Sequence, residues 1–341
     1  MRLVLVGFGV VAQAFTKMIA ARRDQLLRGY GLNPRIVAAI DRRGYAADPK
    51  GLRPEQLIEE KASKGSIAEK ELATRDVQAR AELIREIDAD VVIETTPTNL
   101  QDGQPGITHI EKALAGRKHV ITTNKGPLAL ALPALTELAE HNGVELRFSA
   151  TVGGGTPVLE FAKRCLSADR LLSLQGILNG TTNFILTQMG KQGISFEDAL
   201  ATAQRLGYAE ADPTLDVEGY DTACKVVIIA NWLFHRRVTL KDVRIQGIRG
   251  ITQKQVQDAA ARQRALKLLG FVDTSLRVEP TEIPFNDPIC VEGTLNAVRF
   301  HTEYAGEEII IGKGAGGMET ASAVLRDLLT IRDRMSEELR S

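Results

Sequence analysis

The N-terminus carries an apolar run that leads directly into a glycine turn and then into an amphipathic segment. Residues 3–6 read as a short strand, and a helical pattern follows the turn to about residue 28. In such a unit Gly7 allows the tight turn, Gly9 lets a pyrophosphate approach the backbone, and Ala12 lets strand and helix pack closely. A glycine turn in another kind of α/β unit is the alternative. The expected cofactor-binding residues of this turn are Gly7, Phe8, Gly9, Val10 and Val11.

The end of the second expected strand, residues 36–40, bears on which dinucleotide binds. Asp41 follows this strand, and a carboxylate here normally accepts hydrogen bonds from the adenosine ribose hydroxyls, which favours NAD. Arg42 and Arg43 come next and could instead hold the 2′-phosphate of NADP. Asp41 also lies further from the glycines than the usual spacing of about 20 residues. All three residues are cofactor-binding candidates, and the choice between NAD and NADP stays open.

Two further strands end in polar turns. Residues 91–94 lead to Thr95 and Thr96, and residues 119–122 lead to a turn that holds Lys125. Ligands of an open parallel sheet lie at the carboxyl ends of its strands. We therefore expect Thr95, Thr96 and Lys125 beside a nicotinamide. For the two threonines, ordinary loop and helix-cap chemistry is the alternative.

Three consecutive glycines, residues 153–155, lie in the loop 149–157, after a helical pattern (128–141) and a strand pattern (144–148). Glycines let backbone carbonyl groups converge in ways that other residues forbid. A hard cation held by carbonyl oxygens fits such a loop. A metal-free loop that leads into the next helix is the default interpretation.

An acidic stretch precedes a lysine at the entrance of an apolar helix. Its charged residues are Glu210, Asp212, Asp216, Asp221 and Lys225. Asp221 and Lys225 are four residues apart and share one helix face. A lysine there is costly to bury unless it is paired, and burial lowers the pKa of its amine toward values useful for acid–base chemistry. For this pair alone a structural ion pair is the alternative, but the additional carboxylates, folded back by the Pro213 turn, favour a site.

The second half of the chain has a mixed pattern, unlike the βαβ alternation before it. Its expected elements are a strand 172–178, helices 180–191 and 253–269, and short antiparallel strands over 271–311 with a hairpin turn at Ala305-Gly306. A final helix is expected to return to the first domain. In the first half, residues 49–78 are expected to form a polar, largely helical segment. We expect an α/β protein with a Rossmann-type doubly wound parallel sheet in residues 1–130 plus 312–341, and a second α+β domain in residues 131–311.

Composition excludes several classes of function. Lysine plus arginine equals aspartate plus glutamate at 43 each, which gives no support to nucleic-acid or membrane-surface binding. The three cysteines are widely spaced, so neither a disulfide framework nor a zinc site is indicated, and a reducing cytoplasm is expected. The N-terminal apolar run is too short for a signal peptide, and no run approaches membrane-spanning length.

Six motifs together resemble the homoserine dehydrogenases over nearly the whole chain. They are GFGVVA at the N-terminus, TTNKGPLA at 122–129, ATVGGGTPV at 150–158, LNGTTNFI at 178–185, GYAEADPTLDVEGYDTACK at 207–225 and GAGGMETASAVLRDL at 314–328. The acidic motif and LNGTTNFI are the most specific. The resemblance implies NAD(P)-dependent interconversion of L-homoserine and L-aspartate 4-semialdehyde, in the aspartate pathway to threonine, methionine and isoleucine. It also implies a homodimer formed through the sheet of the second domain.

The resemblance also implies roles for individual residues. Lys225 would give or take the proton at the substrate oxygen, and Lys125 would lie near both nicotinamide and substrate. Glu210 and Asp221 match contacts to the substrate amine, with Asp216 as a supporting carboxylate. Thr95, Gly207 and Gly316 match positions near the cofactor. The oxygens of a monovalent-cation site, usually sodium, match Ser149, Val152, Gly154 and Thr156.

Two departures from the family pattern stand out. Met318-Glu319 replaces a proline that many members carry before the Thr-Ala pair, and the chain stops at Ser341 without the regulatory domain of longer members. We therefore expect no feedback control by threonine through such a module. Two alternatives remain: a dehydrogenase of another small amino or hydroxy acid, and a non-catalytic nucleotide sensor. A sensor has no need for Lys125 together with Lys225, so the enzyme is favoured.

Overall fold

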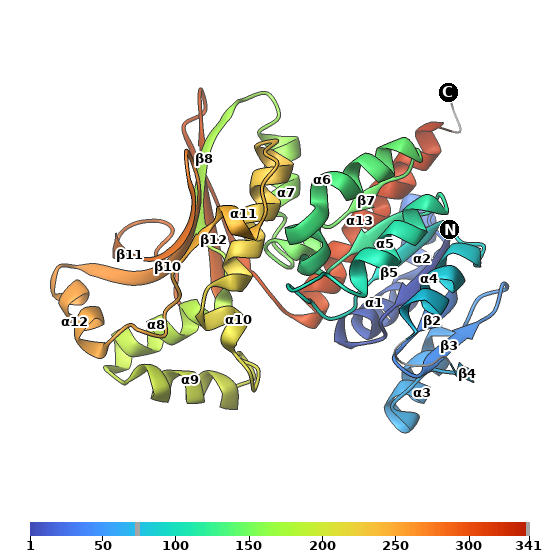
Figure 1. The fold of residues 1–341 in the computed structure, drawn as a ribbon, viewed down its shortest axis with the longest axis horizontal. Helices are drawn as coiled ribbons and strands as arrows, with labels where there is room; N and C mark the ends of the chain where they lie inside the picture. The colour runs from blue at the N-terminus through green and yellow to red at the C-terminus, as the bar shows by residue number, and fades with distance from the viewer. Residues whose placement is uncertain (72–75, 339–341) are drawn as a thin grey trace. The chain divides into compact units, whose positions relative to one another are not determined.

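The computed structural model describes residues 1–71 and 76–338, which divide into two compact units (Figure 1). The first unit contains Met1–Thr151 and the chain from Gly317 onward, and the second contains Val152–Gly316. The expected boundary after residue 130 falls inside helix α6 (Lys125–His141), and the one after residue 311 falls inside strand β13 (Glu307–Lys313). α6 has a kink at Ala131 but lies wholly in the first unit, which runs on to Thr151, and β13 lies wholly in the second unit, which ends at Gly316.

The first unit is built on a sheet whose described strands have the order β4-β3-β2-β1-β5-β6-β7. These strands are β1 (Arg2–Val6), β2 (Arg35–Ile40), β3 (Gly44–Ala47), β4 (Lys70–Glu71), β5 (Val91–Glu94), β6 (His119–Thr122) and β7 (Leu146–Arg147). From β2 to β7 all neighbours are parallel, whereas β3 and β4 extend the edge in antiparallel pairing. The chain order reverses between β1 and β5. This is the expected Rossmann-type arrangement, and ligands of such sheets bind where the chain order reverses.

Register brings the carboxyl ends of the four central strands to one edge. Val6 at the end of β1 is paired with Ile40 on one side and with Glu94 on the other. Glu94 is in turn paired with Thr122 at the end of β6. The glycine turn, Asp41, Thr95 and Lys125 therefore leave the sheet at the same edge.

Seven described helices surround this sheet. They are α1 (Val10–Ala21), α2 (Arg23–Tyr30), α3 (Pro54–Lys64), α4 (Val77–Glu86), α5 (Gly106–Ala115), α6 (Lys125–His141) and α13 (Gly317–Glu338). α13 packs against α1, and both contribute to the core over β1 (Figure 1). The single helix expected to about residue 28 is instead two helices that meet at Arg22. The helical segment expected at 49–78 contains α3 but also β4, and its residues 72–75 lie outside the described residues.

The second unit contains a sheet with the described order β13-β12-β8-β10-β11-β9. Its strands are β8 (Leu171–Ile177), β9 (Arg244–Ile245), β10 (Arg264–Val272), β11 (Leu276–Pro284), β12 (Leu295–Thr302) and β13 (Glu307–Lys313). Its helical segments are α7 (Val158–Glu160), which continues as a π-helical turn (Phe161–Cys165), α8 (Gly180–Gln192), α9 (Phe196–Arg205), α10 (Thr214–Val217), α11 (Tyr220–Leu233), a 3-10 turn (Leu240–Asp242) and α12 (Gln253–Ala261). Helices α8, α11 and α12 all contact β10. The antiparallel β12–β13 hairpin is confirmed.

The helix expected over residues 253–269 is wrong in its second half. α12 ends at Ala261, and Gln263 adopts a left-handed φ of 58° that reverses the chain into β10. Lys267 on β10 is only 3% exposed, because its ammonium donates to Asn183 Oδ1 and to the Val291 carbonyl, both at 2.7 Å. Because a lysine is usually exposed, Lys267 made the sequence of this central strand look like a continuation of the surface helix.

Within the described residues, no helix combines the length and the apolar character that crossing a lipid bilayer requires.

Candidate active site

The glycine turn leaves the start of α1 open for an anion. Gly9 is the N-cap of α1, no side chain caps the helix, and its first turn has no acidic residue. Helix N–H groups in that condition form an anion site suited to a pyrophosphate. Gly7 has φ +88°, and a Cβ added there would lie 2.9 Å from the Thr95 carbonyl carbon and oxygen. Phe8 is buried in the core, so only its backbone faces this turn.

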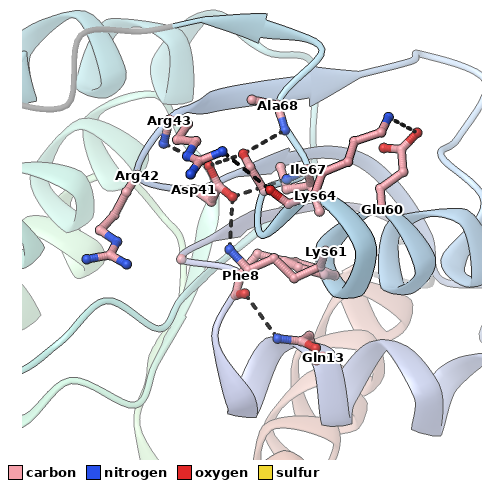
Figure 2. A network of polar contacts seen from close by, with 12 residues as sticks. Phe8, Gln13, Asp41, Arg42, Arg43, Glu60, Lys61, Lys64, Ile67 and Ala68 are labelled. Carbon is pink, nitrogen blue, oxygen red and sulfur yellow. Dashed lines mark hydrogen bonds and ion pairs between the residues drawn. The ribbon is translucent and has the colours of Figure 1, made fainter.

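Asp41 is enclosed by donors from its own chain (Figure 2). Its Oδ1 accepts from the Arg43 backbone N–H at 2.8 Å and from Ser66 Oγ at 3.1 Å. Its Oδ2 accepts from Lys61 Nζ at 3.0 Å and from the Ile67 N–H at 3.1 Å. Burial opposes ionisation, but these hydrogen bonds outweigh it and lower the pKa of Asp41. The carboxylate is thus ionised, and its lone pairs are already used.

Arg42 and Arg43 are exposed beside this buried carboxylate. The Arg42 side chain extends away from the Asp41 cluster (Figure 2), while its backbone carbonyl accepts from Arg80 Nη2 at 2.8 Å. Arg43 Nη1 donates to the Lys64 carbonyl at 3.3 Å. The end of β2 therefore presents guanidinium groups at its surface rather than a carboxylate.

The turn after β5 contacts the glycine turn, and the turn after β6 leaves the sheet at the same edge. Thr95 Oγ1 donates to the Gly7 carbonyl at 2.6 Å. Lys125 is the first residue of α6, and Asn124 caps that helix by accepting from the Gly126 N–H at 3.1 Å. The Thr95 and Lys125 turns are thus both fixed at the carboxyl edge of the first sheet.

In the second unit, Lys225 joins Asp221 in a buried polar cluster. Lys225 Nζ donates to Asp221 Oδ2 at 2.7 Å and to the Leu178 carbonyl at 2.5 Å. Asn179 Nδ2 donates to Asp221 Oδ2 at 2.9 Å and to Asp216 Oδ1 at 2.7 Å. The Lys225 side chain is 7% exposed and that of Asp221 is 13% exposed. The end of β8, α10 and α11 thus bring two carboxylates to one ammonium.

The pKa of Asp216 in this cluster is shifted by its surroundings. Burial, and then the negative charge of Asp221, raise the pKa of Asp216, while the hydrogen bond from Asn179 and the charge of Lys225 partly oppose the shift. A buried lysine paired with one carboxylate, near a second carboxylate of raised pKa, is the type of group that catalytic sites use.

The structure does not bring every predicted residue of the acidic stretch into this cluster. Glu210 and Asp212 are exposed, and Asp212 Oδ1 accepts from the Thr214 N–H at 3.1 Å. Gly207 (φ +74°) and Gly316 (φ +131°) are exposed residues of the second unit. Glu210 is therefore a candidate through its position in the loop, without a contact to Lys225.

The candidate cation ligands do not all belong to one unit. Ser149 lies in the first unit, where its N–H donates to buried Asp327 Oδ2 at 2.9 Å. Val152, Gly154 and Thr156 form part of a buried loop of the second unit, and Thr156 Oγ1 donates to the Lys313 carbonyl at 3.2 Å.

Known proteins with matching sequences have the same two parts, a nucleotide-binding domain and a second domain that corresponds to the one holding Lys225 and Asp221. A family model described as the NAD-binding domain of homoserine dehydrogenase matches residues 7–149, and the homoserine dehydrogenase model matches residues 157–329. This chain belongs to the homoserine dehydrogenase family. The homoserine dehydrogenase of Methanocaldococcus jannaschii is 44% identical over 332 residues, which cover 97% of this chain and 98% of that protein.

Two further homoserine dehydrogenases extend the comparison. The NAD(+)-dependent homoserine dehydrogenase of Pseudomonas canavaninivorans is 39% identical over 97% of this chain and 96% of that protein. The crystal structure of the Thiobacillus denitrificans enzyme superposes with a TM-score of 0.84 at 31% identity, over 99% of this chain and 74% of that one. As a homoserine dehydrogenase, the chain is an NAD(P)-dependent oxidoreductase that interconverts L-homoserine and L-aspartate 4-semialdehyde.

Two polar residues that hold the predicted site residues in place were not predicted from the sequence. Asn179 caps α8 by accepting from the Thr182 N–H, and its amide also links Asp216 to Asp221. Glu94 is the last residue of a buried strand, yet it accepts hydrogen bonds from Thr96 in the turn after β5 and from Thr122 at the end of β6. The signal available was a carboxylate placed inside an otherwise apolar strand run.

Proposed function

We propose that Lys225 is the residue that moves the proton at the substrate oxygen in this homoserine dehydrogenase. The observation that supports it is the near-complete burial of Lys225 with Asp221 at 2.7 Å. A lysine ammonium has three N–H donors. Asp221 and the Leu178 carbonyl use two of them, which leaves one for a substrate oxygen.

The same lysine serves both directions of the reaction. A bound nicotinamide accepts or gives the hydride. In reduction, the Lys225 ammonium stabilises charge that grows on the carbonyl oxygen and then donates its proton. In oxidation, a neutral Lys225 takes the proton from the alcohol. We propose that Lys125 of the first unit also serves this reaction, near the nicotinamide and the substrate.

The acidic loop is proposed to recognise the amine of the substrate. Asp221 and Glu210 are the proposed contacts, and Asp216 supports Asp221 through Asn179. Asp216 and Asp221 lie in one buried cluster, and Glu210 adds a third carboxylate from the same loop, so the negative charge there attracts an ammonium group. The same arrangement therefore favours an amino acid over a neutral alcohol as the substrate.

Replacing Asp221 with asparagine should raise the KM for homoserine roughly 10- to 100-fold, since a charge-assisted hydrogen bond is worth about 1.5–3 kcal/mol. The asparagine keeps the size of the side chain but removes the negative charge next to Lys225. Initial rates over a range of homoserine concentrations would measure the effect. Asp212→Asn, at an exposed carboxylate of the same loop, is the matched control. An unchanged KM together with an unchanged kcat would refute the role of Asp221.

We further propose that NADP binds at least as tightly as NAD. Support comes from the lone pairs of Asp41, which internal donors already use, and from the exposed guanidinium groups of Arg42 and Arg43. Arg-to-phosphate hydrogen bonds are strong and need no ribose contact from Asp41. The Pseudomonas canavaninivorans relative is named for NAD(+), so residues at this turn would decide the difference.

Arg42→Ala should weaken NADP binding by about tenfold or more and leave NAD binding within about twofold, because only NADP carries the 2′-phosphate. Dissociation constants of both nucleotides, measured by fluorescence titration of the wild-type and variant proteins, give the comparison. Arg22→Ala, at the junction of α1 and α2, is the control. Equal losses for the two nucleotides would count against this assignment.

The proposal extends to the remaining parts of the site. Thr95 and Thr96 at the β5 turn, and Gly207 and Gly316 in the second unit, are proposed cofactor neighbours. A monovalent cation, sodium by resemblance, is proposed for the loop 152–156, in which Gly153 and Gly154 adopt left-handed φ angles. The first unit is proposed as the nucleotide-binding domain and the second as the catalytic and dimerisation domain.

The setting of the enzyme is proposed as well. A homodimer through the sheet of the second unit is supported by the isoleucines of edge strand β13, of which Ile311 is 47% exposed. None of the three cysteines is in a disulfide, in keeping with a reducing cytoplasm. The aspartate pathway to threonine and methionine is the proposed metabolic role.

A further inference from the structure

Glu94, the last residue of β5, is a fully buried carboxylate that no step of the proposed reaction uses. Its Oε1 accepts from the Thr96 backbone N–H at 2.9 Å and from the Thr96 hydroxyl. Its Oε2 accepts from Thr122 Oγ1, at the end of β6, at 2.8 Å. One carboxylate therefore joins the ends of β5 and β6, which lead to the turns that hold Thr95 and Lys125.

Asn124 closes these hydrogen bonds into a ring. Its backbone N–H donates to Thr122 Oγ1 at 3.0 Å, and its Nδ2 donates to Thr96 Oγ1 at 3.2 Å. Its Oδ1 accepts from the Gly126 N–H at 3.1 Å and so caps α6. The ring passes through Glu94, Thr122, Asn124 and Thr96, and the helix that it caps begins with Lys125.

Close packing prevents this turn from shifting. A Cβ on Gly126 would lie 2.3 Å from the Asn99 carbonyl oxygen, and a Cβ on Gly106 would lie 2.7 Å from Asn124 Nδ2. Backbone approaches this short exist only because both residues are glycine. The backbone of Lys125 is therefore held from two sides, by the ring and by the loop after β5.

A carboxylate is a costly group to place at this point. Burial raises the pKa of Glu94, and the hydrogen bonds from Thr96, Thr122 and Asn124 oppose that shift. A leucine or valine would fill a buried strand end at lower cost. The position therefore retains a buried, hydrogen-bonded carboxyl group where ligands of an open sheet bind, which is typical of function rather than of stability.

We infer that Glu94 is a positioning residue that fixes Lys125 at the start of α6 through the ring it forms with Thr122, Asn124 and Thr96. The inference rests on the proposed function, in which Lys125 serves the reaction near the nicotinamide. Glu94 itself touches neither substrate nor cofactor in this role. It acts by setting where the Lys125 backbone begins.

The test uses substitutions that break the hydrogen bonds of the ring but keep the volume of each side chain. Glu94→Gln puts an amide NH₂ against donors, and Thr122→Val removes the hydroxyl that links Glu94 to Asn124. Each should lower kcat about tenfold or more, because displacing a reacting group by about 1 Å costs up to about 10²-fold. Thr122→Ser, which keeps the hydroxyl, should stay within about twofold of wild type. Glu82→Gln, at a surface carboxylate paired with Lys112, is the matched control.

Two further measurements distinguish a positioning role from a purely structural role of the ring. The dissociation constant for NADP should change less than about threefold in Thr122→Val, since the glycine turn and Arg42, the proposed phosphate-binding residues, are not part of the ring. Introduced into Lys125→Ala, both ring variants should cause little further loss of kcat, because effects of coupled residues are not additive. If Glu94→Gln fails to fold, Thr122→Val and Thr122→Ser carry the comparison.

Two results would overturn the inference. The first is wild-type kcat in Thr122→Val, and the second is the same fold loss in the presence and absence of the Lys125 side chain. Failure of the proposed function is distinguishable, since it would appear as absence of homoserine-dependent turnover in the unaltered enzyme.

Discussion

Lys225→Ala should lower the turnover of homoserine about 10²-fold or more, which is the usual contribution of a positioned general acid or base. The variant loses both the proton carrier and the cation that stabilises charge at the substrate oxygen. Nucleotide affinity should stay nearly intact, because the glycine turn and Arg42 belong to the first compact unit. The expected signature is a loss in kcat with a nearly constant dissociation constant for NADP.

Stability must be separated from chemistry in that experiment. Removing Lys225 leaves Asp221 without its cation at a largely buried position, so the alanine variant should also unfold more easily. Lys225→Met keeps most of the side-chain volume and should show the same loss of kcat. Lys254→Ala, at an exposed position of α12, is the control that should behave as wild type. Near-normal turnover in a folded Lys225→Ala protein would refute the assignment.

Alanine at Gly7 and at Gly9 should both weaken dinucleotide binding by tenfold or more, but for different reasons that stability measurements separate. At Gly7 a side chain must adopt φ +88° and lies 2.9 Å from the Thr95 carbonyl, so the fold itself is strained. A left-handed non-glycine residue costs about 1–2 kcal/mol before that overlap is counted. At Gly9 a Cβ meets nothing within 4 Å, so the chain tolerates it.

The Gly9 methyl group would occupy the open space in front of α1, where a pyrophosphate approaches the backbone. Gly9→Ala should therefore lose NAD and NADP affinity with an unchanged melting temperature, whereas Gly7→Ala should lose both affinity and stability. Calorimetric titration and thermal unfolding of the two variants give the comparison. Gly29→Ala, whose Cβ also meets nothing within 4 Å, is the control. Unchanged affinity in Gly9→Ala would place the nucleotide elsewhere.

Local sequence patterns predicted the parts of the fold that are formed by contiguous residues. The N-terminal strand, glycine turn and helix form one contiguous unit, so the sequence alone located the turn at Gly7. The pairing of Asp221 with Lys225 was also foreseeable, because a spacing of four residues on a helix places both on one face. The β12–β13 hairpin turns at the glycine that the pattern indicated.

Features that depend on distant residues were not predictable in the same way. The pattern at residues 253–269 reads as one helix, but Lys267 is buried by partners from α8 and from the loop before β12. The internal use of Asp41 depends on Lys61, Ser66 and Ile67, which no spacing rule connects to it. Buried polar groups take their partners from tertiary structure, and their roles therefore emerge only when the fold is known.

The most direct test of the central claim is the initial rate of nicotinamide reduction by the unaltered protein with L-homoserine, measured by absorbance with NAD and with NADP. We expect homoserine-dependent reduction with at least one nucleotide, and no comparable rate with L-serine, which is one methylene shorter. Absence of reduction with both nucleotides, or an equal rate with L-serine, would contradict the assignment of homoserine as the substrate.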